Sequence, residues 1–457
     1  MADTRLPQLE SLLRRSGPLT AAALGAALDV SQPTISRLLT GAGERIVRIG
    51  KARASRYALG RDIALAGNRW PLYRIGPDGR SDTLGELRAL HGGGFHFEPA
   101  RPLPAFLHGD FANGLFPGLP WFLDDQRPQG FLGRAFVRRV APSIDAPGDL
   151  AQWNADHIVL ALLRHGADEP GDLVLGEASL QYALQAMLSP HAMAPKERVA
   201  RYPALADKAL AGENIGSSAG GEQPKFTALL RIDAGTQAVI VKFSERTGTP
   251  AAQRWADLLR CEHIASQTLR AYGIAAAETE LLEADGRVFL QSLRFDRTPS
   301  LGRRGQVSLA SLDAAHYGHG RIDWWKFSPQ LRRDGWLDAA AARTLALCGW
   351  FGALIGNNDM HLGNASVVLT DARPMALAPS YDMLPMALRP TPTGEVVARE
   401  IPIAVPLPEH LEDWRPAAEM ACSFWRQVMD EAAISDGFHA IAEVQLAKLE
   451  TARARFA

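Results

Sequence analysis

The chain has few cysteines, no long apolar run and almost no net charge, and each shortage excludes a class of protein. Only three cysteines, Cys261, Cys348 and Cys422, occur in 457 residues, and they lie far apart without the spacing of metal ligands. This excludes a disulfide framework and is typical of buried thiols in a reducing compartment.

Membrane and secretion signals are also missing. The longest apolar run, Leu345–Ile355, is too short to span a bilayer and contains two glycines. The first residues lack the charged-then-apolar layout of a signal peptide. We therefore expect a cytoplasmic protein that makes no contact with membranes.

The net charge of −1 excludes a whole-molecule field that would attract nucleic acid, but it hides an asymmetry. Residues 1–61, here called the head, hold ten Lys or Arg against four Asp or Glu. A basic end on a near-neutral body favours a nucleic-acid-binding function for that end.

Three stretches rich in Gly, Pro or charged residues divide the chain, at 60–79, 142–147 and 291–305. The length is also too great for a single hydrophobic core. We predict four units: a winged helix-turn-helix at 1–61, a β-rich subdomain at 62–145, a small lobe at 146–297 and a helical large lobe at 298–457.

The head has the pattern of short helices followed by a hairpin. Helical spacing at 9–15, 21–28 and 32–39 is interrupted by turns, with Thr20 and Ser31 as candidate N-caps. Two alternating apolar stretches, 46–49 and 55–59, flank a basic Gly-Lys-Ala-Arg turn. Two helices joined by a short turn form a helix-turn-helix, and the hairpin would be its wing.

In this arrangement the second helix of the motif would read the major groove, and the wing would meet phosphates. The alternative is a small helical bundle with a solvated basic face. The candidate DNA-binding residues are Gln32, Thr34, Ser36 and Arg37 on the helix, and Lys51 and Arg53 in the wing.

The most informative feature is a polar loop, Gly356–Asn364, which we call the Asn/Asp loop. It places Asp359 five positions before Asn364, behind an apolar helix, and Asp382 follows eighteen residues later. This is the layout of a phosphoryl-transfer loop, in which one Asp accepts a proton while an Asn and a later Asp bind Mg²⁺. The alternative is an Asn/Asp-rich turn between two core elements.

A glycine-rich loop precedes two predicted strands, 226–232 and 238–243. Lys242 lies in the second strand, where a buried ammonium needs a partner. A helix capped by Thr249 follows and offers Glu262 as that partner, with Glu245 and Asp257 as alternatives.

The same region has the elements of an ATP site. Glycines let backbone N–H groups approach phosphates. Backbone groups near Leu293 and Phe295 could hold an adenine edge, and Asp296 could reach the ribose. The candidate ATP-binding residues are Gly220, Gly221, Gln223, Lys225, Lys242, Glu262, Leu293, Phe295 and Asp296.

Together these motifs resemble the HipA family of bacterial serine/threonine kinase toxins, over about residues 62–450. The stretches that carry the resemblance are Ser218–Lys225, Val239–Lys242, Arg294–Arg297, Asn358–Asn364 and Ser380–Pro385. The resemblance implies an α+β, bilobal protein-kinase-like fold, and the head adds an N-terminal winged helix-turn-helix. It also implies Mg-ATP as cofactor and a protein substrate, with aminoacyl-tRNA synthetases and other translation components as the usual target class.

Carried over residue by residue, the resemblance makes Lys242 the ligand of the α/β-phosphates and Asp359 the general base. Asn364 and Asp382 would bind Mg²⁺, and His361 would brace the loop.

The glycine loop has a further implied role. Ser218, or its neighbour Ser217, matches a position at which these kinases phosphorylate themselves. The added negative charge would displace the loop from ATP.

The chain departs from the family pattern at its head. HipA-type kinases usually work with a separate helix-turn-helix antitoxin that binds their operator, whereas here such an element precedes the kinase-like body. The subgroup with a fused head is therefore the nearest match, and a separate antitoxin protein stays an open partner.

Two other functions remain open. One is a transcriptional regulator whose kinase-like body only senses a nucleotide, and the other is a metal-dependent enzyme that acts on DNA. His316 and His319 lack further ligands nearby and are interpreted as loop residues. Trp324 and Trp325 are interpreted as packing residues, and the stretch Leu119–Arg134 as structural.

Overall fold

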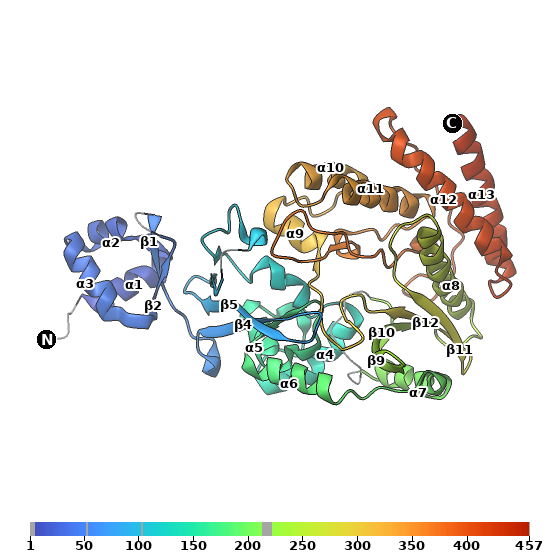
Figure 1. Cartoon of the computed structure of the whole chain (residues 1–457). Coiled ribbons are helices and arrows are strands. Elements are labelled where there is room, and N and C mark those ends of the chain that lie inside the picture. Colours follow the sequence, from blue (N-terminus) through green and yellow to red (C-terminus); the bar gives the residue numbers. More distant parts are fainter. Residues whose placement is uncertain (1–4, 52–53, 102–103, 213–221, 457) are drawn as a thin grey trace.

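The computed structural model describes residues 5–51, 54–101, 104–212 and 222–456 (Figure 1). Helices and sheets are mixed along the chain, as expected for an α+β fold. Five predicted site residues lie outside the described residues: Arg53, Ser217, Ser218, Gly220 and Gly221. Among the described residues, no helix is both long and apolar enough to cross a membrane.

In its described residues the head contains three α-helices and a small antiparallel sheet of order β1-β3-β2. Its apolar core is built from one face of each helix and includes Leu9, Leu24 and Ile35. The side chain of Thr20 accepts a hydrogen bond from the Ala23 backbone at 3.2 Å, as predicted for an N-cap. The elements are α1 (Leu6–Ser16), β1 (Leu19–Thr20), α2 (Ala21–Leu28), α3 (Gln32–Ala42), β2 (Ile46–Ile49) and β3 (Arg56–Leu59).

The head is packed against the next part of the chain. Val47, Ile49 and Ala58 form a buried cluster with Leu90 from the following sheet. Strand β3 leads directly into a bridge between Gly60 and Leu90. The backbone pairing at this junction fixes the direction in which the chain leaves the head.

A five-stranded antiparallel sheet of order β7-β6-β5-β4-β8 follows. Its fifth strand lies beyond residue 145, so the sheet includes residues from both the predicted β-rich subdomain and the predicted small lobe. Pro142, near the predicted boundary, lies inside a helix. The boundaries of the units remain predictions. The strands are β4 (Arg69–Ile75), β5 (Ser81–Ala89), β6 (Phe95–Pro99), β7 (Leu115–Phe116) and β8 (Leu173–Leu175), and the helices are α4 (Gly130–Ile144), α5 (Ala155–His165) and α6 (Glu177–Leu188).

The predicted lysine strand lies in a second antiparallel sheet, of order β11-β12-β10-β9. Its buried face packs Phe226, Val239 and Phe289 against Tyr202 of α7. The elements are α7 (Arg198–Leu210), β9 (Lys225–Ile232), β10 (Gly235–Phe243), α8 (Pro250–Ala271), β11 (Thr279–Ala284) and β12 (Arg287–Leu293).

Helix α8 begins where the sequence predicts, because Thr249 accepts a hydrogen bond from the Ala252 backbone at 3.1 Å. Ala256 and Leu259 pack against Val288 and Leu290 of the sheet. This packing places Glu262, about three helical turns into α8, where it meets Lys242 of strand β10.

The C-terminal part is mainly helical, and its apolar helix α11 ends at the Asn/Asp loop (Figure 1). Trp325 stacks on Trp350 of α11 with ring centroids 4.1 Å apart, which confirms a packing role for this tryptophan. The elements are β13 (Val307–Ser308), α9 (Leu309–His316), α10 (Trp324–Arg333), α11 (Ala339–Leu354), β14 (Ser366–Val367), α12 (Leu411–Asp430) and α13 (Asp436–Arg455).

Candidate functional site

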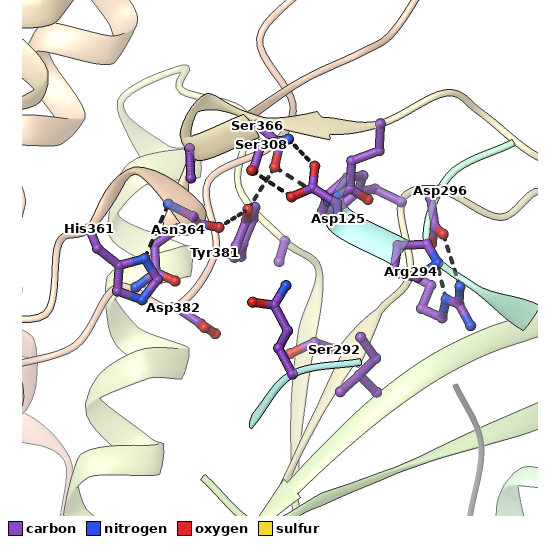
Figure 2. Close-up of a pocket in the computed structure, with 18 of the residues that line it drawn as sticks. Asp125, Ser292, Arg294, Asp296, Ser308, His361, Asn364, Ser366, Tyr381 and Asp382 are labelled. Carbon is purple, nitrogen blue, oxygen red and sulfur yellow. Dashed lines mark hydrogen bonds and ion pairs between the residues drawn. The ribbon is translucent and has the colours of Figure 1, made fainter. Parts of the chain in front are cut away.

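A cavity of about 330 Å³ lies between the four-stranded sheet and the loops that follow α11 (Figure 2). Its size falls in the range of small-molecule sites. Most predicted ATP and metal residues line it, together with residues that no motif had indicated. The predicted residues in its wall are Lys225, Lys242, Glu262, Leu293, Phe295, Asp296, His361, Asn364 and Asp382.

The buried ammonium of Lys242 is at the centre of an ionic cluster. It donates to both carboxylate oxygens of Glu262, at 2.6 and 2.8 Å, and also to one oxygen of Asp382. The predicted pairing with Glu262 is therefore present. Asp257 instead accepts hydrogen bonds from Ser435, and Glu245 is exposed, so neither is the partner.

The pKa shifts in this cluster follow from burial and from close opposite charges. Burial lowers the pKa of Lys242, but Asp382 and Glu262 outweigh it and raise the pKa above its usual value. Burial raises the pKa of Glu262. Burial opposes ionisation of Asp382 too, yet Lys242 and Lys225 hold its pKa below the ordinary value.

Lys225 is the second lysine in the wall. It lies opposite Lys242 in the register of β9 and β10. Burial, together with the neighbouring Lys242 cation, lowers the pKa of Lys225 to about 8. An anion in the cavity would stabilise the charged form of this lysine, as a phosphate-binding role requires.

The Asn/Asp loop is held by its own side chains. Asn357 accepts a hydrogen bond from the Asp359 backbone at 3.1 Å and donates to the Asp382 carbonyl at 3.1 Å. Asn364 donates its amide to the Asp359 carbonyl at 2.8 Å. The side chain of Asp359 is exposed and is not part of the cavity wall, so it faces solvent where a second molecule could approach.

His361 stabilises the same loop. Its Nδ1 accepts a hydrogen bond from the Gly363 backbone at 3.1 Å, which caps a short turn of helix at Leu362–Asn364. The ring is otherwise exposed and lines the cavity. These contacts are consistent with the bracing role that the resemblance implies.

The donor set fits Mg²⁺ better than a metal that is held by protein ligands alone. Among the described residues, no three His, Cys, Asp or Glu side chains come together as a metal cage. The amide nitrogen of Asn364 is engaged, which leaves its oxygen as the coordinating atom, and Asp382 adds a carboxylate. Mg²⁺ commonly takes one or two protein oxygens and completes its shell with phosphates and water.

The predicted adenine and ribose contacts are only partly supported. The Leu293 N–H already donates to the Glu278 carbonyl at 2.8 Å, and the Phe295 carbonyl accepts from Arg304 at 3.1 Å. Asp296 lines the cavity, but its side chain is already engaged. Arg294, Arg297 and the backbone of Gly171 surround its carboxylate, which has the lowered pKa of a structural ion pair.

The structure describes all of the expected nucleic-acid residues except Arg53, and most of those described are exposed. Gln32, Ser36 and Arg37 are exposed on α3, while the opposite face of this helix is buried in the core of the head. Thr34 is half-buried and accepts a hydrogen bond from Arg37 at 3.3 Å. Lys51 is exposed in the turn after β2.

Sequence reasoning missed one group of residues in the cavity wall. Asp125 and Gln129 come from the stretch Leu119–Arg134, which had no assigned chemistry. The Asp125 carboxylate accepts hydrogen bonds from Ser308 and Ser311. No local pattern indicates these contacts, because they join segments more than a hundred residues apart.

The fold and the site define a class: a two-part, kinase-like protein with a buried lysine-carboxylate cluster facing an Asn/Asp loop. Residues 217–448 match the family described as the HipA-like C-terminal domain. Residues 66–184 match the YjjJ-like toxin, middle domain. The chain thus belongs to the HipA-like toxin family, in its YjjJ-like branch.

Two known proteins illustrate this membership. Toxin YjjJ of Escherichia coli (strain K12) is 35% identical over 441 residues, which cover 96% of each chain. HipA of Shewanella oneidensis MR-1, solved in a complex with HipB and its operator DNA, superposes with a TM-score of 0.50 at 16% identity. That match covers 83% of this chain and 97% of the HipA chain, and it shows a shared fold.

Proposed function

We propose that the chain is an ATP- and Mg-dependent serine/threonine protein kinase of the toxin type. The observation that carries the proposal is the cluster of buried Lys242 and Glu262 with half-buried Asp382, which faces a cavity beside Asn364. A strand lysine paired with a helix glutamate, next to an Asp and an Asn, is the set of groups that phosphoryl transfer needs.

The chain's own residues have separate roles in this reaction. Lys242 and Lys225 hold the phosphates of ATP, and Glu262 fixes the position of Lys242. The exposed Asp359 takes the proton of a serine or threonine hydroxyl as its oxygen bonds to the γ-phosphorus. The bond from that phosphorus to the β,γ-bridging oxygen then breaks, and ADP leaves with the bridging oxygen.

Asn364 and Asp382 would hold Mg²⁺, which neutralises charge on the phosphates when it is bound. As the family resemblance implies, the substrate is a protein, with translation components as the first class to test. Self-phosphorylation at Ser217 or Ser218 is part of the same proposal, although both residues lie outside the described part of the chain.

The test is to incubate the purified full chain with Mg-ATP and to locate phosphate by intact-mass and peptide mass spectrometry. We expect phosphate on Ser217 or Ser218 in the parent and none in Asp359→Ala. Asn358→Ala changes the exposed neighbouring residue and serves as the matched control, which should still be phosphorylated. A parent chain that binds no ATP by calorimetry would refute the proposal.

We also propose that the head is a winged helix-turn-helix that binds DNA. Helix α3 exposes Gln32, Ser36 and Arg37 after a three-residue turn from α2, and the β2–β3 hairpin carries Lys51 in the position of a wing. Helices of this kind place polar side chains against base edges, while basic residues meet phosphates. HipA of S. oneidensis was solved with HipB and operator DNA, which favours DNA and an antitoxin protein as partners to test.

The DNA proposal is tested by anisotropy titration with the DNA upstream of the gene that encodes the chain. Arg37→Ala should weaken binding and reduce its salt dependence, because a phosphate or base contact is lost. Arg80→Ala removes a highly exposed arginine outside the head and should leave binding unchanged. Equal losses in both variants would point to non-specific charge attraction instead of a head-specific site.

A further inference from the structure

One wall of the cavity comes from outside the region that matches the HipA-like C-terminal domain. The short helical turn Trp121–Gln126 and the residues after it bring Asp125 and Gln129 into contact with the cavity. This wall lies in the YjjJ-like middle region, at residues 66–184. The proposed nucleotide site is therefore completed by a segment that precedes the kinase-like sheet in the chain.

The Asp125 carboxylate is held rigidly at the start of helix α9. It accepts from the Ser308 hydroxyl at 2.6 Å, the Ser311 hydroxyl at 2.9 Å and the Ser308 backbone N–H at 2.5 Å. Figure 2 shows Asp125 beside Ser308 and Ser366, between Tyr381 and the Arg294–Asp296 pair. A side chain fixed by three donors is preorganised and loses little conformational freedom when it binds a ligand.

A count of acceptor positions separates Asp125 from Asp296. An ionised carboxylate can accept about four hydrogen bonds. Asp296 receives two from Arg294, one from Arg297 and one from the Gly171 backbone, three of them on one oxygen, so it is engaged mainly by two arginine cations. Asp125 receives three from the described residues, which leaves one position for a donor in the cavity.

The surroundings of Asp125 indicate which part of a nucleotide would supply that donor. Two lysines, Lys225 and Lys242, attract phosphate, and both belong to the ionic cluster around Glu262. The carboxylate of Asp125 would instead repel phosphate. Apolar residues suited to a base, such as Ile240 and Leu293, come from strands β10 and β12. The remaining donors of a nucleotide near a carboxylate are the hydroxyl groups of its sugar.

We propose that Asp125 accepts a hydrogen bond from a ribose hydroxyl of the bound nucleotide and so determines the preference for ribonucleotides. This inference rests on the proposed ATP-dependent function. Gln129 and Gln306, which line the same cavity, supply further polar groups to this sugar-binding wall. Asp125 thus takes the place that the sequence had given to Asp296.

The experiment compares the affinities of the full chain for ATP, 2′-deoxy-ATP and 3′-deoxy-ATP by calorimetry. The parent should bind ATP about tenfold more tightly than at least one deoxy analogue, the loss expected for one hydrogen bond to a charged group. Asp125→Asn keeps the shape but removes the charge, and it should bring that ratio close to one.

Ser311→Ala is the matched control, since it removes one hydrogen bond to Asp125 but leaves the carboxylate in place. It should keep the preference of the parent for ATP. If Asp125 were only a cap of α9, both variants would lower the melting temperature and neither would change the affinity ratio. That result would overturn the proposal.

Two further outcomes are distinguishable. Purine riboside triphosphate lacks the amino group of adenine. If the parent binds it more weakly than ATP and Asp125→Asn does not, the carboxylate contacts the base, and the proposed sugar contact is overturned. A parent chain that binds none of the nucleotides would refute the proposed function itself, whereas ATP binding with an unchanged ratio refutes only the role of Asp125.

Discussion

At the scale of single residues, the buried Lys242 links stability to the proposed chemistry. Its side chain is 7% exposed and that of Glu262 is 5% exposed, so neither charge is solvated by water. A buried pair of this kind adds little net stability, but removal of one partner leaves an unpaired charge at high cost. The pair therefore serves to hold an ammonium group at the cavity.

Lys242→Met should abolish measurable ATP turnover, a loss of at least about 10²-fold. It should also reduce the free energy of unfolding by about 3–5 kcal/mol, because Glu262 stays buried without its cation. Burial already raises the pKa of Glu262, so in this variant the folded state binds a proton more tightly than the unfolded state.

The stability deficit of Lys242→Met should then grow as pH rises above the ordinary pKa of a glutamate. Urea unfolding at about pH 5 and about pH 8 measures this difference. Lys326→Met, at an exposed lysine, is the control and should show neither effect. A deficit that is independent of pH would argue against an ionised, unpaired Glu262.

Asp172 gives a second pH-dependent prediction. Burial raises the pKa of this carboxyl from 3.8 to about 6, although Arg74 lies 3.1 Å away. Because the pKa of the folded state is the higher one, stability from this group is present below about pH 4 and is lost as pH rises through about 6. A difference of this size corresponds to about 3 kcal/mol.

Asp172→Asn should remove this loss, so its free energy of unfolding should fall less between acid and neutral pH than that of the parent. Asp78→Asn changes an exposed aspartate that is paired with Arg80 and is the control, expected to keep the pH dependence of the parent. Parallel pH profiles for parent and Asp172→Asn would contradict the assignment.

At the scale of elements, the end of helix α11 determines where the Asn/Asp loop begins. Gly356 has a φ of 81°, in the left-handed region. A Cβ atom on this residue would lie 2.7 Å from Cδ1 and 2.9 Å from Cγ2 of Ile401, so the isoleucine side chain would have to shift. The glycine thus permits both the turn and the close packing beneath the loop.

Gly356→Ala should lower the free energy of unfolding by about 1–3 kcal/mol through backbone strain. The contact of the new Cβ atom with Ile401 should lower it further. It should also weaken nucleotide binding, because the loop is displaced. Gly335→Ala is the matched control: its φ of 74° is equally strained, but no atom lies within 4 Å of a Cβ there. Thermal unfolding and ATP titration of both variants separate the effect of backbone strain from that of displacing the Asn/Asp loop. If both variants lost the same stability and ATP affinity, the packing argument would be refuted.

Residues of the site differ in how far the sequence could predict them. Lys242 and Glu262 could be predicted because a lysine in an apolar strand needs a carboxylate, and the capped helix that follows offers one. The ribose contact given to Asp296 stays a prediction, because this residue lines the cavity but its carboxylate is engaged by contacts such as that to Gly171, 125 residues away in the chain. Asp125 could not be predicted for the same reason, because Ser308 lies 183 residues further on.

Elements were easier to predict than contacts. The helices and strands of the head, strands β9 and β10 and the start of α8 follow from periodicity and caps, which are local. The fifth strand of the five-stranded sheet, β8, is only three residues long and pairs with a strand about a hundred residues earlier. Its position depends on tertiary packing, which a single sequence does not display.

At the scale of the whole molecule, the head and the body form a continuous structure at their junction. Arg61 donates its backbone N–H to Ala89 at 2.9 Å, and its side chain donates to Asp156 at 2.8 Å. Leu90 is 1% exposed beneath the hairpin of the head. We therefore expect the head to be coupled to the body and not to rotate freely on a linker.

Leu90→Asn should loosen this junction at a cost of about 2–5 kcal/mol, the usual range for loss of a buried leucine. Hydrogen exchange of amides in α2 and α3 should become faster, while exchange in α8 changes less. Leu65→Asn is the control, since Leu65 is fully exposed and the change is chemically the same. Unchanged exchange in the head of Leu90→Asn would mean that the head is stable without the junction.

The paired junction at Gly60 and Leu90 has a consequence for the cell. Where a toxin and its DNA-binding regulator are separate proteins, their ratio depends on how fast each is made and degraded. If the head has the DNA-binding role proposed for it, one polypeptide carries both parts, so every copy has one of each and dilution cannot alter that stoichiometry. If the head restrains the kinase-like body, it does so as an intramolecular event whose strength is independent of how much protein the cell contains.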